Sequence, residues 1–280
     1  MDTYCVFGHP IEHSKSPWIH ARFAQLTGQT LTYSKTLAPL DGFAKTLQSF
    51  QAQGGKGCNV TLPFKTEAAA LATRCSPRVS LAQACNTLKF DGQEIFGENT
   101  DGLGLVNDLV RNAGCHLQGK SLLLIGAGGA AAGVLGPLLC EKPRHIYVAN
   151  RTHNKAIQLV KRHAALALAE GVECLAFDLQ HEVIHSQSFD VVINASSSSL
   201  QQGELPVPAS VLSRHGMACD LMYGPASQGF MDWARSNGAE ARDGLGMLVE
   251  QAAESFQLWR GVRPPTAPVL AELRALLAKS

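Results

Sequence analysis

A glycine-rich turn between an apolar run and an alanine-rich segment is the clearest chemical feature of the chain. Residues 122–125 (Leu-Leu-Leu-Ile) predict a buried strand, and Gly126, Gly128 and Ala131 follow in G-x-G-x-x-A spacing before a predicted helix at 132–139. The first glycine permits a tight turn, the second lets the backbone approach a pyrophosphate, and the small third residue lets helix and strand pack closely. Amides at the helix start then suit phosphate oxygens. The pattern favours a dinucleotide site, although an ordinary strand-to-helix turn uses similar glycines.

The residues after the next predicted strand, 144–149, indicate which dinucleotide the turn would prefer. An NAD-binding protein places Asp or Glu there to hold the ribose 2′-hydroxyl. This chain has Asn150, Arg151 and Thr152 instead, so no carboxylate follows the strand and a guanidinium is placed to bind a 2′-phosphate. The sequence therefore favours NADP over NAD. The alternative is that Arg151 is only a solvated residue of a first helical turn.

Two serines and a lysine fall at other predicted strand-to-helix junctions. Ser14 and Ser16 follow the first strand, with Ser16 predicted as N-cap and Pro17 as the first helical residue. Lys65 falls in the first turn of a helix predicted from Pro63 toward residue 74, where the helix dipole disfavours a cation. Two hydroxyls suit a carboxylate, and a lysine suits proton transfer. Helix capping and simple exposure explain the same residues from their positions alone.

Three further polar residues, Asp101, Gln251 and Asn194, could likewise have a structural or a ligand-binding role. Asp101 follows a predicted hairpin and precedes a helix at 102–112, where it would either cap the helix or face a ligand. Met247 and Gln251 lie one helical turn apart, where a polar Gln251 could line a cleft or simply mark the edge of the core. Asn194 and the serines at 196–199 end another predicted strand, where a nicotinamide ribose could lie.

A regular alternation of strands and helices must position these groups. The middle of the chain has predicted strands at 122–125, 144–149, 172–177, 190–195 and 216–221. Strands that alternate with helices in this way predict a parallel, doubly wound sheet. The fold class is thus α/β with two domains: an open twisted α/β substrate domain and a Rossmann-type doubly wound NADP-binding domain. The predicted boundaries are 1–101 for the substrate domain, completed by C-terminal helices at 238–280, and 102–237 for the NADP domain.

The first hundred residues and the end of the chain supply the remaining elements. Predicted strands lie at 3–8, 31–37 and 57–61, with a hairpin at 84–96 around Asp91-Gly92 and a helix at 40–50. A strong helix after Gly246 carries apolar residues at helical spacing. These are Leu245, Leu248, Val249, Ala252, Phe256 and Trp259, and a last helix is predicted at 269–278.

Composition excludes several classes of protein. The 280 residues carry a formal net charge of +1, which does not suggest a nucleic-acid or membrane-surface partner. No secretory signal and no apolar run near the ~20 residues of a membrane span are visible. Eight scattered cysteines without a C-x-x-C pair suit a reducing cytoplasm. Ten histidines without metal-ligand spacing lead us to predict no metal site.

Several rare motifs, taken in order, resemble those of the shikimate dehydrogenase family nearly from end to end. Their joint occurrence is highly specific. The motifs are Phe7-Gly-His-Pro10, Ser14-Lys-Ser-Pro17, Asn59-Val-Thr-Leu-Pro-Phe-Lys65, Asn86-Thr87, Asn99-Thr-Asp-Gly102, Gly126-Ala-Gly-Gly129, Asn150-Arg-Thr152, Ile193-Asn-Ala195, Asp220 to Tyr223, and Asp243-Gly-Leu-Gly-Met-Leu-Val-Glu-Gln-Ala252.

The resemblance implies a reversible, NADPH-dependent reduction of 3-dehydroshikimate to shikimate on the route to chorismate and aromatic amino acids. It implies that Lys65 and Asp101 are catalytic. The implied substrate-binding residues are Ser14 and Ser16 on the carboxylate with Tyr223 nearby, and Thr61, Asn86, Asp101 and Gln251 on the ring hydroxyls. The implied NADP-binding residues are Gly126, Ala127, Gly128, Gly129, Ala130, Asn150, Arg151, Thr152, Asn194, Ala195, Ser196, Leu221, Gly244 and Met247. A cytoplasmic monomer or homodimer is expected.

The chain departs from the family pattern after the glycine turn. Many relatives carry Ser-Arg there, whereas this chain has Ala131-Ala132, so a cation near the cofactor phosphates is missing and NADP binding would rest more on Arg151. Two rival hypotheses remain open at this point: a quinate/shikimate dehydrogenase that uses NAD as well as NADP, and a non-catalytic NADP-binding regulator. The presence of both Lys65 and Asp101 argues against the regulator.

Overall fold

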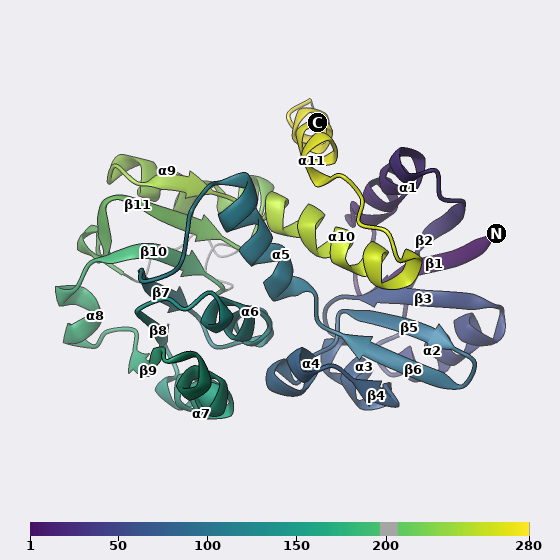
Figure 1. Cartoon of the computed structure of the whole chain (residues 1–280), viewed down its shortest axis with the longest axis horizontal. Coiled ribbons are helices and arrows are strands. Elements are labelled where there is room, and N and C mark those ends of the chain that lie inside the picture. The colour runs from purple at the N-terminus through teal and green to yellow at the C-terminus, as the bar shows by residue number, and fades with distance from the viewer. Residues whose placement is uncertain (197–206, 280) are drawn as a thin grey trace. The chain divides into compact units, whose positions relative to one another are not determined.

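The computed structural model describes residues 1–196 and 207–279 and divides the chain into two compact units (Figure 1). The serines predicted at 197–199 to adjoin a nicotinamide ribose lie outside the described residues. One unit comprises Met1–Gly104 with Leu248–Ser280, and the other comprises Leu105–Met247. The sequence placed 238–247 in the first unit, but β12 (Glu240–Arg242) pairs in parallel with β11 (Leu212–Asp220) and so belongs to the second. The chain passes between the units within helices α5 and α10.

The first unit is built on a six-stranded mixed sheet in the order β2-β1-β3-β5-β6-β4. Strand β5 runs antiparallel to both β3 and β6, and the β5–β6 hairpin turns at Gly92, whose φ of +58° suits glycine. The predicted hairpin is therefore confirmed. The strands are β1 (Asp2–Gly8), β2 (Leu31–Leu37), β3 (Gly55–Val60), β4 (Arg74–Cys75), β5 (Thr87–Asp91) and β6 (Glu94–Glu98).

Helices of the first unit pack on both faces of this sheet because side chains alternate along each strand. One apolar cluster joins Phe7 and Cys58 to Phe43 of α2 and Phe64, next to α3. On the other face, Tyr4 stacks on Trp259 of α10 at 4.7 Å between ring centroids. The helices are α1 (Ser16–Thr27), α2 (Phe43–Ala52), α3 (Lys65–Leu71), α4 (Pro77–Ala82), α5 (Asp101–Asn107), α10 (Leu245–Arg260) and α11 (Thr266–Leu277).

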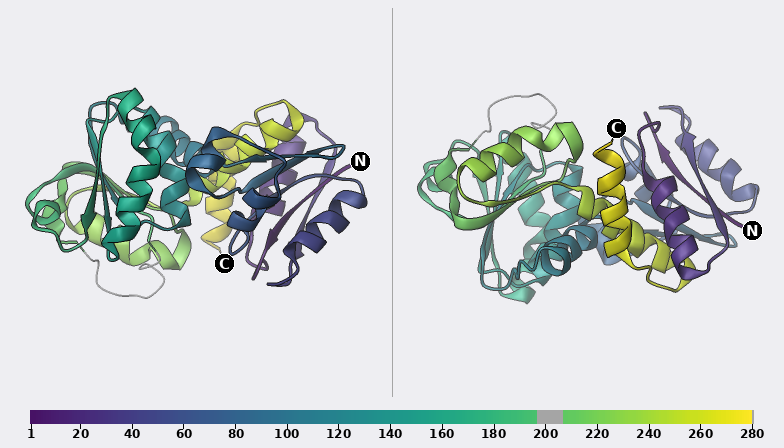
Figure 2. Two further views of the ribbon diagram at one scale, coloured as in Figure 1. Left: turned by 90° about the horizontal axis from the view of Figure 1, so that it is seen from below. Right: turned by 90° about the horizontal axis from the view of Figure 1, so that it is seen from above.

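The second unit has a fully parallel sheet in the order β12-β11-β10-β7-β8-β9, with helices on both faces (Figure 2). The order reverses between β7 and β10, as in a Rossmann sheet. The predicted fold class is confirmed. The elements are η1 (Asp108–Asn112), β7 (Ser121–Ile125), α6 (Gly129–Cys140), β8 (His145–Asn150), α7 (His153–Glu170), β9 (Glu173–Asp178), α8 (Glu182–Ser186), β10 (Phe189–Asn194), η3 (Ala209–Val211), β11, η4 (Gly224–Ser227), α9 (Gln228–Ser236) and β12.

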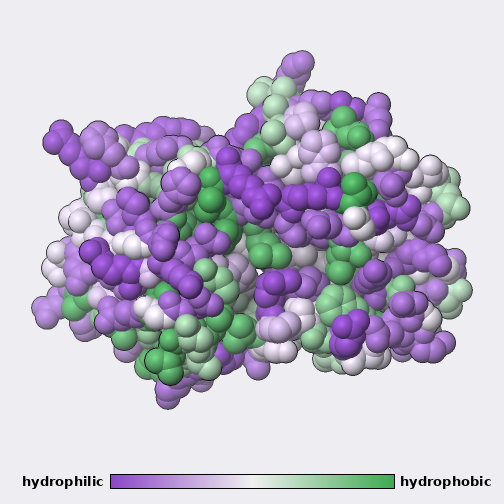
Figure 3. All heavy atoms as spheres, in the orientation of Figure 1, coloured by the Kyte–Doolittle hydropathy of each residue, from purple (hydrophilic) through white to green (hydrophobic). Residues whose placement is uncertain are grey.

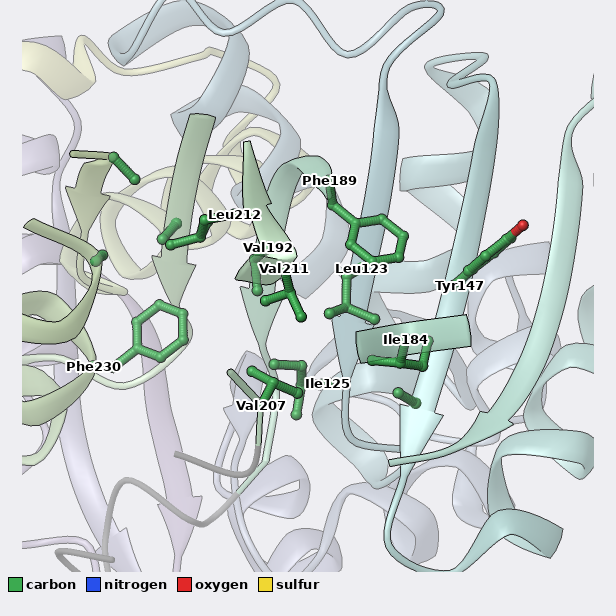
Figure 4. Packing of buried hydrophobic residues seen from close by; sticks show 14 of the residues in the cluster. Leu123, Ile125, Tyr147, Ile184, Phe189, Val192, Val207, Val211, Leu212 and Phe230 are labelled. Atoms are coloured by element: carbon green, nitrogen blue, oxygen red, sulfur yellow. The ribbon is translucent and has the colours of Figure 1, made fainter. Parts of the chain in front are cut away.

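One core cluster of the second unit lies between the sheet and helices α8 and α9 (Figure 4). Leu123 and Phe189 from the strands meet Ile184 of α8 and Phe230 of α9, and all four side chains are buried. Each such side chain contributes roughly 1.5–3 kcal/mol when fully removed from water. The continuous apolar strands therefore fix the sheet that carries the glycine turn.

The surface mixes side chains of different polarity in small patches. Hydrophilic residues are spread widely over the face shown in Figure 3, with hydrophobic ones scattered between them. Among the described residues, no helix combines the length and apolar character needed to cross a bilayer. All eight cysteines are free thiols, and Cys5, Cys58, Cys85 and Cys219 are buried.

Several local predictions were wrong. Ser16 is the first helical residue of α1 rather than its N-cap, which is Lys15, because Pro17 takes the second helical position. The helix predicted from Pro63 to residue 74 begins at Lys65 and ends at Leu71, where a β4 strand and helix α4 follow. The helix after Asp101 ends in a π-helical turn, η1. The short elements α4, α8, α9 and β12 were missed, although α9 carries its buried residues Phe230, Met231 and Ala234 on one face.

A buried ion pair stabilises the part of the second unit where α10 begins. Arg242 donates to both carboxylate oxygens of Asp108, at 2.6 Å and 3.2 Å, and Asp108 is fully buried. Gly246 lies against this carboxylate, and a Cβ on Gly246 would lie 1.9 Å from Asp108 Oδ1. Because breaking a buried pair leaves an uncompensated charge, this position tolerates no side chain.

We therefore expect Gly246→Ala to lower the free energy of unfolding by about 1–3 kcal/mol, since overpacking displaces the ion pair. Urea unfolding monitored by circular dichroism measures the change. Gly229→Ala in α9 is the matched control, because no atom lies within 4 Å of its added Cβ. Alanine there should be neutral or stabilising by up to about 1 kcal/mol through helix propensity. Equal stability of the two variants would contradict the packing argument.

Candidate active site

The first unit brings Lys65 and Asp101 into direct contact. Lys65 Nζ lies 2.6 Å from Asp101 Oδ2, and the two side chains are only 22% and 10% exposed. Lys65 begins α3 and Asp101 begins α5, so each is held at a helix start on a different segment. The backbone links the two segments through residues 85 and 86, because Cys85 N donates to Lys65 O at 2.8 Å and Asn86 N donates to Glu98 O at 3.1 Å. A nearly enclosed lysine–carboxylate pair can supply and reorient a proton at a bound ligand.

The side-chain amide of Asn86 holds the other oxygen of Asp101. Asn86 Nδ2 donates to Asp101 Oδ1 at 2.9 Å, and Thr100 N donates to Asn86 Oδ1 at 2.9 Å. Because a backbone N–H can only donate, Asn86 has one amide orientation that satisfies both bonds. Gln251, from α10, accepts from Asn86 Nδ2 at 3.3 Å. Four predicted site residues thus meet in one place, although they come from four segments of the chain.

Sequence reasoning missed a second layer of polar side chains behind Asn86. This layer comprises Asn59, Thr87, Thr100 and Ser255, all buried. Asn59 Nδ2 donates to Ser255 Oγ at 2.9 Å, and Ser255 Oγ lies 2.8 Å from Thr87 Oγ1. The first three belong to the motifs Asn59–Lys65, Asn86-Thr87 and Asn99–Gly102, which was the available signal. Nothing in the sequence distinguishes Ser255 from any other helical serine.

The predicted carboxylate ligands lie at the start of α1. Ser16 N donates to Ser14 Oγ at 3.3 Å, and Ser16 is buried. Thr61 follows β3, where its N–H donates to Phe7 O at 2.9 Å. Its methyl group approaches Gly8 so closely that a Cβ there would lie 2.6 Å away. These contacts put Ser14, Ser16 and Thr61 at the carboxyl ends of β1 and β3, the edge where open α/β sheets bind ligands.

An aromatic cluster lies behind Ser16. The hydroxyl of Tyr33 lies near Ser16 and donates to Asn59 Oδ1 at 2.7 Å, and burial raises the pKa of this hydroxyl well above the usual value. His20 stacks on Tyr33 at 4.2 Å between ring centroids and packs against Phe256. Burial lowers the pKa of His20 to about 3, and Asn59 only partly opposes the shift. The imidazole is therefore a neutral packing group.

The glycine turn of the second unit has the backbone that a pyrophosphate requires. Gly126 directly follows β7 and has a φ of +109°, and a Cβ there would lie 2.9 Å from Ala195 O. No atom lies within 4 Å of a Cβ added to Gly128 or Gly129, and both are exposed. Ala127 is half-buried and Ala130 is exposed. A ligand therefore has room beside this turn, and the first amides of α6 have no acceptor within the helix.

The turn after β8 presents cationic groups. Asn150 Nδ2 donates to Thr152 O at 2.9 Å and closes the turn, and Arg151 and Thr152 are exposed. Lys155, exposed in the first turn of α7, is a candidate that sequence reasoning missed. Asp178 of β9 lies in register with Asn150, but its carboxylate accepts from Gln180 N at 2.9 Å. The turn therefore remains suited to an anionic phosphate.

The remaining predicted cofactor residues lie at the carboxyl ends of β10 and β11. Asn194 donates to Asp220 Oδ2 at 3.1 Å and accepts from Ser196 Oγ at 2.7 Å. Ala195 N donates to Ile125 O, which draws this strand end to the glycine turn. These contacts bring the ends of β7, β10 and β11 to the same edge of the sheet.

Leu221, Gly244, Met247 and Tyr223 also belong to the second unit. A Cβ on Gly244 would lie 2.2 Å from Leu221 O, so only glycine allows the two backbones to meet. Met247 is half-buried at the start of α10. Tyr223 follows β11, and burial raises the pKa of its hydroxyl. Tyr223 is the one predicted substrate ligand that lies outside the first unit.

Most of the chain matches known protein families. Residues 6–88 match the shikimate dehydrogenase substrate binding domain, residues 108–202 match the shikimate/quinate 5-dehydrogenase family, and residues 244–274 match the shikimate 5′-dehydrogenase C-terminal domain. A relative named shikimate dehydrogenase (NADP(+)) from Acidovorax sp. (strain JS42) is 64% identical, over 99% of this chain and 97% of that protein. This chain belongs to the shikimate dehydrogenase family.

Solved structures share the fold of this chain. An Ael1 enzyme from Pseudomonas putida is 44% identical with a TM-score of 0.91, and the match covers 98% of each chain. Shikimate 5-dehydrogenase from Thermus thermophilus, in complex with NADP(H) and shikimate, is 30% identical with a TM-score of 0.85, over 98% of this chain and 99% of that one. The departure from the family at Ala131-Ala132 is buried in α6, so these methyl groups pack in the core.

Metal ligands do not cluster in the described part of the chain. No group of three or more His, Cys, Asp or Glu side chains there could hold an ion.

The burial of the His20 ring predicts how the free energy of unfolding depends on pH. Its folded pKa of about 3 lies below the ordinary value of 6.5. Between these values the unfolded chain binds a proton that the folded chain does not, so stability falls as the pH drops from about 6.5 toward 3. On going from pH 7 to pH 5, His20→Phe should therefore lose about 2 kcal/mol less unfolding free energy than the parent protein. Urea unfolding at both pH values measures this.

The control for that measurement is His13→Phe, which changes an exposed histidine three residues before α1. It should keep the pH dependence of the parent protein. Comparing each variant with itself at two pH values removes any constant packing effect of the phenyl ring. A His20→Phe protein with an unchanged slope would show that His20 is protonated in the folded state.

Proposed function

We propose that the protein catalyses the reversible, NADPH-dependent reduction of 3-dehydroshikimate to shikimate, a step toward chorismate and the aromatic amino acids. The observation that carries the proposal is the enclosed Lys65–Asp101 pair, 2.6 Å apart and held by Asn86, in a chain of the shikimate dehydrogenase family. The relatives' names supply the substrate and the cofactor. The predicted cytoplasmic location and the predicted monomer or homodimer stay predictions.

The second unit fits NADP. The amides of Gly129 and Ala130 at the start of α6 would hold the pyrophosphate, and Gly126 and Gly128 give it room. Arg151 would bind the 2′-phosphate, with Asn150 and Thr152 shaping the turn. Ala127, Asn194, Ala195, Ser196, Leu221, Gly244 and Met247 would complete the cofactor site. When bound, NADPH supplies the hydride that the substrate carbonyl receives.

The first unit would bind the substrate and supply the proton that the carbonyl oxygen receives. Lys65 donates a proton to the carbonyl oxygen, or stabilises the negative charge on it, as C3 is reduced. Asp101 orients the ammonium and accepts a hydrogen bond from the neighbouring hydroxyl. Two further sets of residues complete the proposal. Ser14, Ser16 and Tyr223 would bind the carboxylate, and Thr61, Asn86 and Gln251 the ring hydroxyls.

Lys65→Ala tests the catalytic assignment. Loss of the proton donor should cut kcat by roughly 10²–10⁴-fold, while the affinity for NADPH stays close to that of the parent protein. Stopped-flow absorbance at the nicotinamide band and fluorescence titration of NADPH measure the two quantities. Lys56→Ala is the matched control, because Lys56 is an exposed lysine of the same unit. A large loss of NADPH binding in Lys65→Ala would refute the assignment.

Arg151→Ala tests the preference for NADP. Removing a charge-assisted bond to the 2′-phosphate should weaken NADPH binding about 10- to 100-fold and leave NADH binding nearly unchanged. Isothermal titration with both cofactors separates the effects. Lys161→Ala, an exposed cation further along α7, should change neither affinity. Equal losses for NADPH and NADH would rule out a 2′-phosphate role for Arg151.

A single assay separates the proposed function from its rivals. Purified protein is mixed with shikimate and NADP, and NAD or quinate replaces one partner in parallel. Reduction that is fast only with shikimate and NADP supports the proposal. Comparable rates with NAD or quinate would assign the broader quinate/shikimate activity, which the name of the matched central family also includes. Cofactor binding without any reduction would indicate a regulator.

A further inference from the structure

The hydroxyl of Thr87 lies where three parts of the first unit meet. Thr87 follows Asn86, begins β5 and is fully buried. Its Oγ1 donates to Asn86 Oδ1 at 2.9 Å, accepts from Asn59 Nδ2 of β3 at 3.0 Å, and lies 2.8 Å from Ser255 Oγ of α10. Being fully buried, Thr87 cannot itself touch a substrate.

The direction of these hydrogen bonds follows from neighbouring groups that can act only as donors or only as acceptors. Asn86 Oδ1 accepts from the backbone N–H of Thr100, so this atom is an acceptor and Thr87 must donate to it. Asn59 Nδ2 donates to the carbonyl oxygen of Asn86 at 3.1 Å, so toward Thr87 it is a donor as well. The hydroxyl thus donates once and accepts from the other side, which satisfies it completely.

Thr87 also reaches Gln251 through the helix that carries it. Ser255 lies one turn after Gln251 in α10. Because the single proton of the Thr87 hydroxyl goes to Asn86, Ser255 Oγ is the donor in the 2.8 Å contact with Thr87. Gln251 Nε2 donates to Leu248 O at 2.9 Å, which turns Gln251 Oε1 toward Asn86 Nδ2 at 3.3 Å. The Thr87–Ser255 contact therefore ties α10, with Gln251, to the start of β5, directly after Asn86.

We propose that Thr87 is a positioning residue of the reaction: it holds the Asn86 amide directly and Gln251 through Ser255, so that both face the substrate ring hydroxyls. This inference rests on the proposed function. It assigns the effect to the hydroxyl rather than to the volume of the side chain. Valine has the same shape, but it leaves Asn86, Asn59 and Ser255 each with one hydrogen bond fewer in the core.

The test compares Thr87→Val, which removes the hydroxyl, with Thr87→Ser, which keeps it. Thr87→Val should lower kcat/KM for shikimate about 5- to 100-fold, with KM for NADP unchanged. Thr87→Ser should stay close to the parent protein in both constants. Thr46→Val is the matched control, because its hydroxyl bonds only a helix carbonyl, Gly42 O, away from this network. A Thr87→Val protein as active as Thr87→Ser would overturn the proposal.

A double-mutant cycle with Ser255→Ala tests the link to α10. If Thr87 acts on Gln251 through Ser255, the double variant should lose no more activity than Thr87→Val alone. Additive losses would contradict the link. Should Thr87→Val fail to fold, Ser255→Ala by itself must raise KM for shikimate and leave KM for NADP unchanged, and an unchanged KM for shikimate overturns the inference. Parent protein without turnover would reject the proposed function instead, so the two failures are distinguishable.

Discussion

The contact between Lys65 and Asp101 sets the requirements that the first unit meets. Both charges lie mostly out of water, where a carboxylate needs hydrogen-bond donors on each oxygen. Lys65 serves one oxygen and Asn86 the other, while Asn99 Oδ1 accepts the amide of Asp101 at 3.1 Å. Glu98, paired with an arginine, in turn accepts from the amide of Asn99. The loop before α5 therefore holds the Asp101 carboxylate in one orientation toward Lys65.

The second unit presents binding groups of a different kind from those of the first unit. Its glycine turn offers backbone amides and open space rather than charged side chains, and Ala131 of α6 is buried in the core. Charge is supplied one strand away, where Arg151 and Lys155 are exposed at the start of α7. Amides recognise any pyrophosphate, whereas a guanidinium recognises an additional phosphate. Separating the two tasks allows cofactor choice to change without disturbing the turn.

Much of this arrangement was predictable from the sequence, for a physical reason. Apolar runs such as 122–125 specify buried strands, and glycine spacing specifies the turn that follows them. The resemblance selected Lys65 and Asp101, whose 2.6 Å contact then appears in the fold. The bond between Thr87 and Ser255 was not predictable, because it joins residues 168 positions apart and depends on how α10 packs. Ser16 was misplaced because proline fits more than one early helical position.

Helices α4 and α9 were missed for a related reason. They have only six and nine residues, and tertiary packing largely decides whether such short segments become helical. Helix α4 is capped by Ser76, which accepts from Val79 N at 3.3 Å while donating to buried Glu98. The serine thus serves the cap and the loop before Asp101 at once, a double use that its position in the sequence does not reveal.

The first unit is made from the two ends of the chain, and this matters during synthesis. Residues up to Gly104 leave the ribosome first, yet Trp259 and Phe256, which cover one face of their sheet, come from a segment made after the whole second unit. Until then Tyr4 and Phe23 have no α10 to pack against. The nascent chain therefore exposes this apolar face while the second unit is synthesised. Such a face is a binding surface for chaperones until α10 covers it.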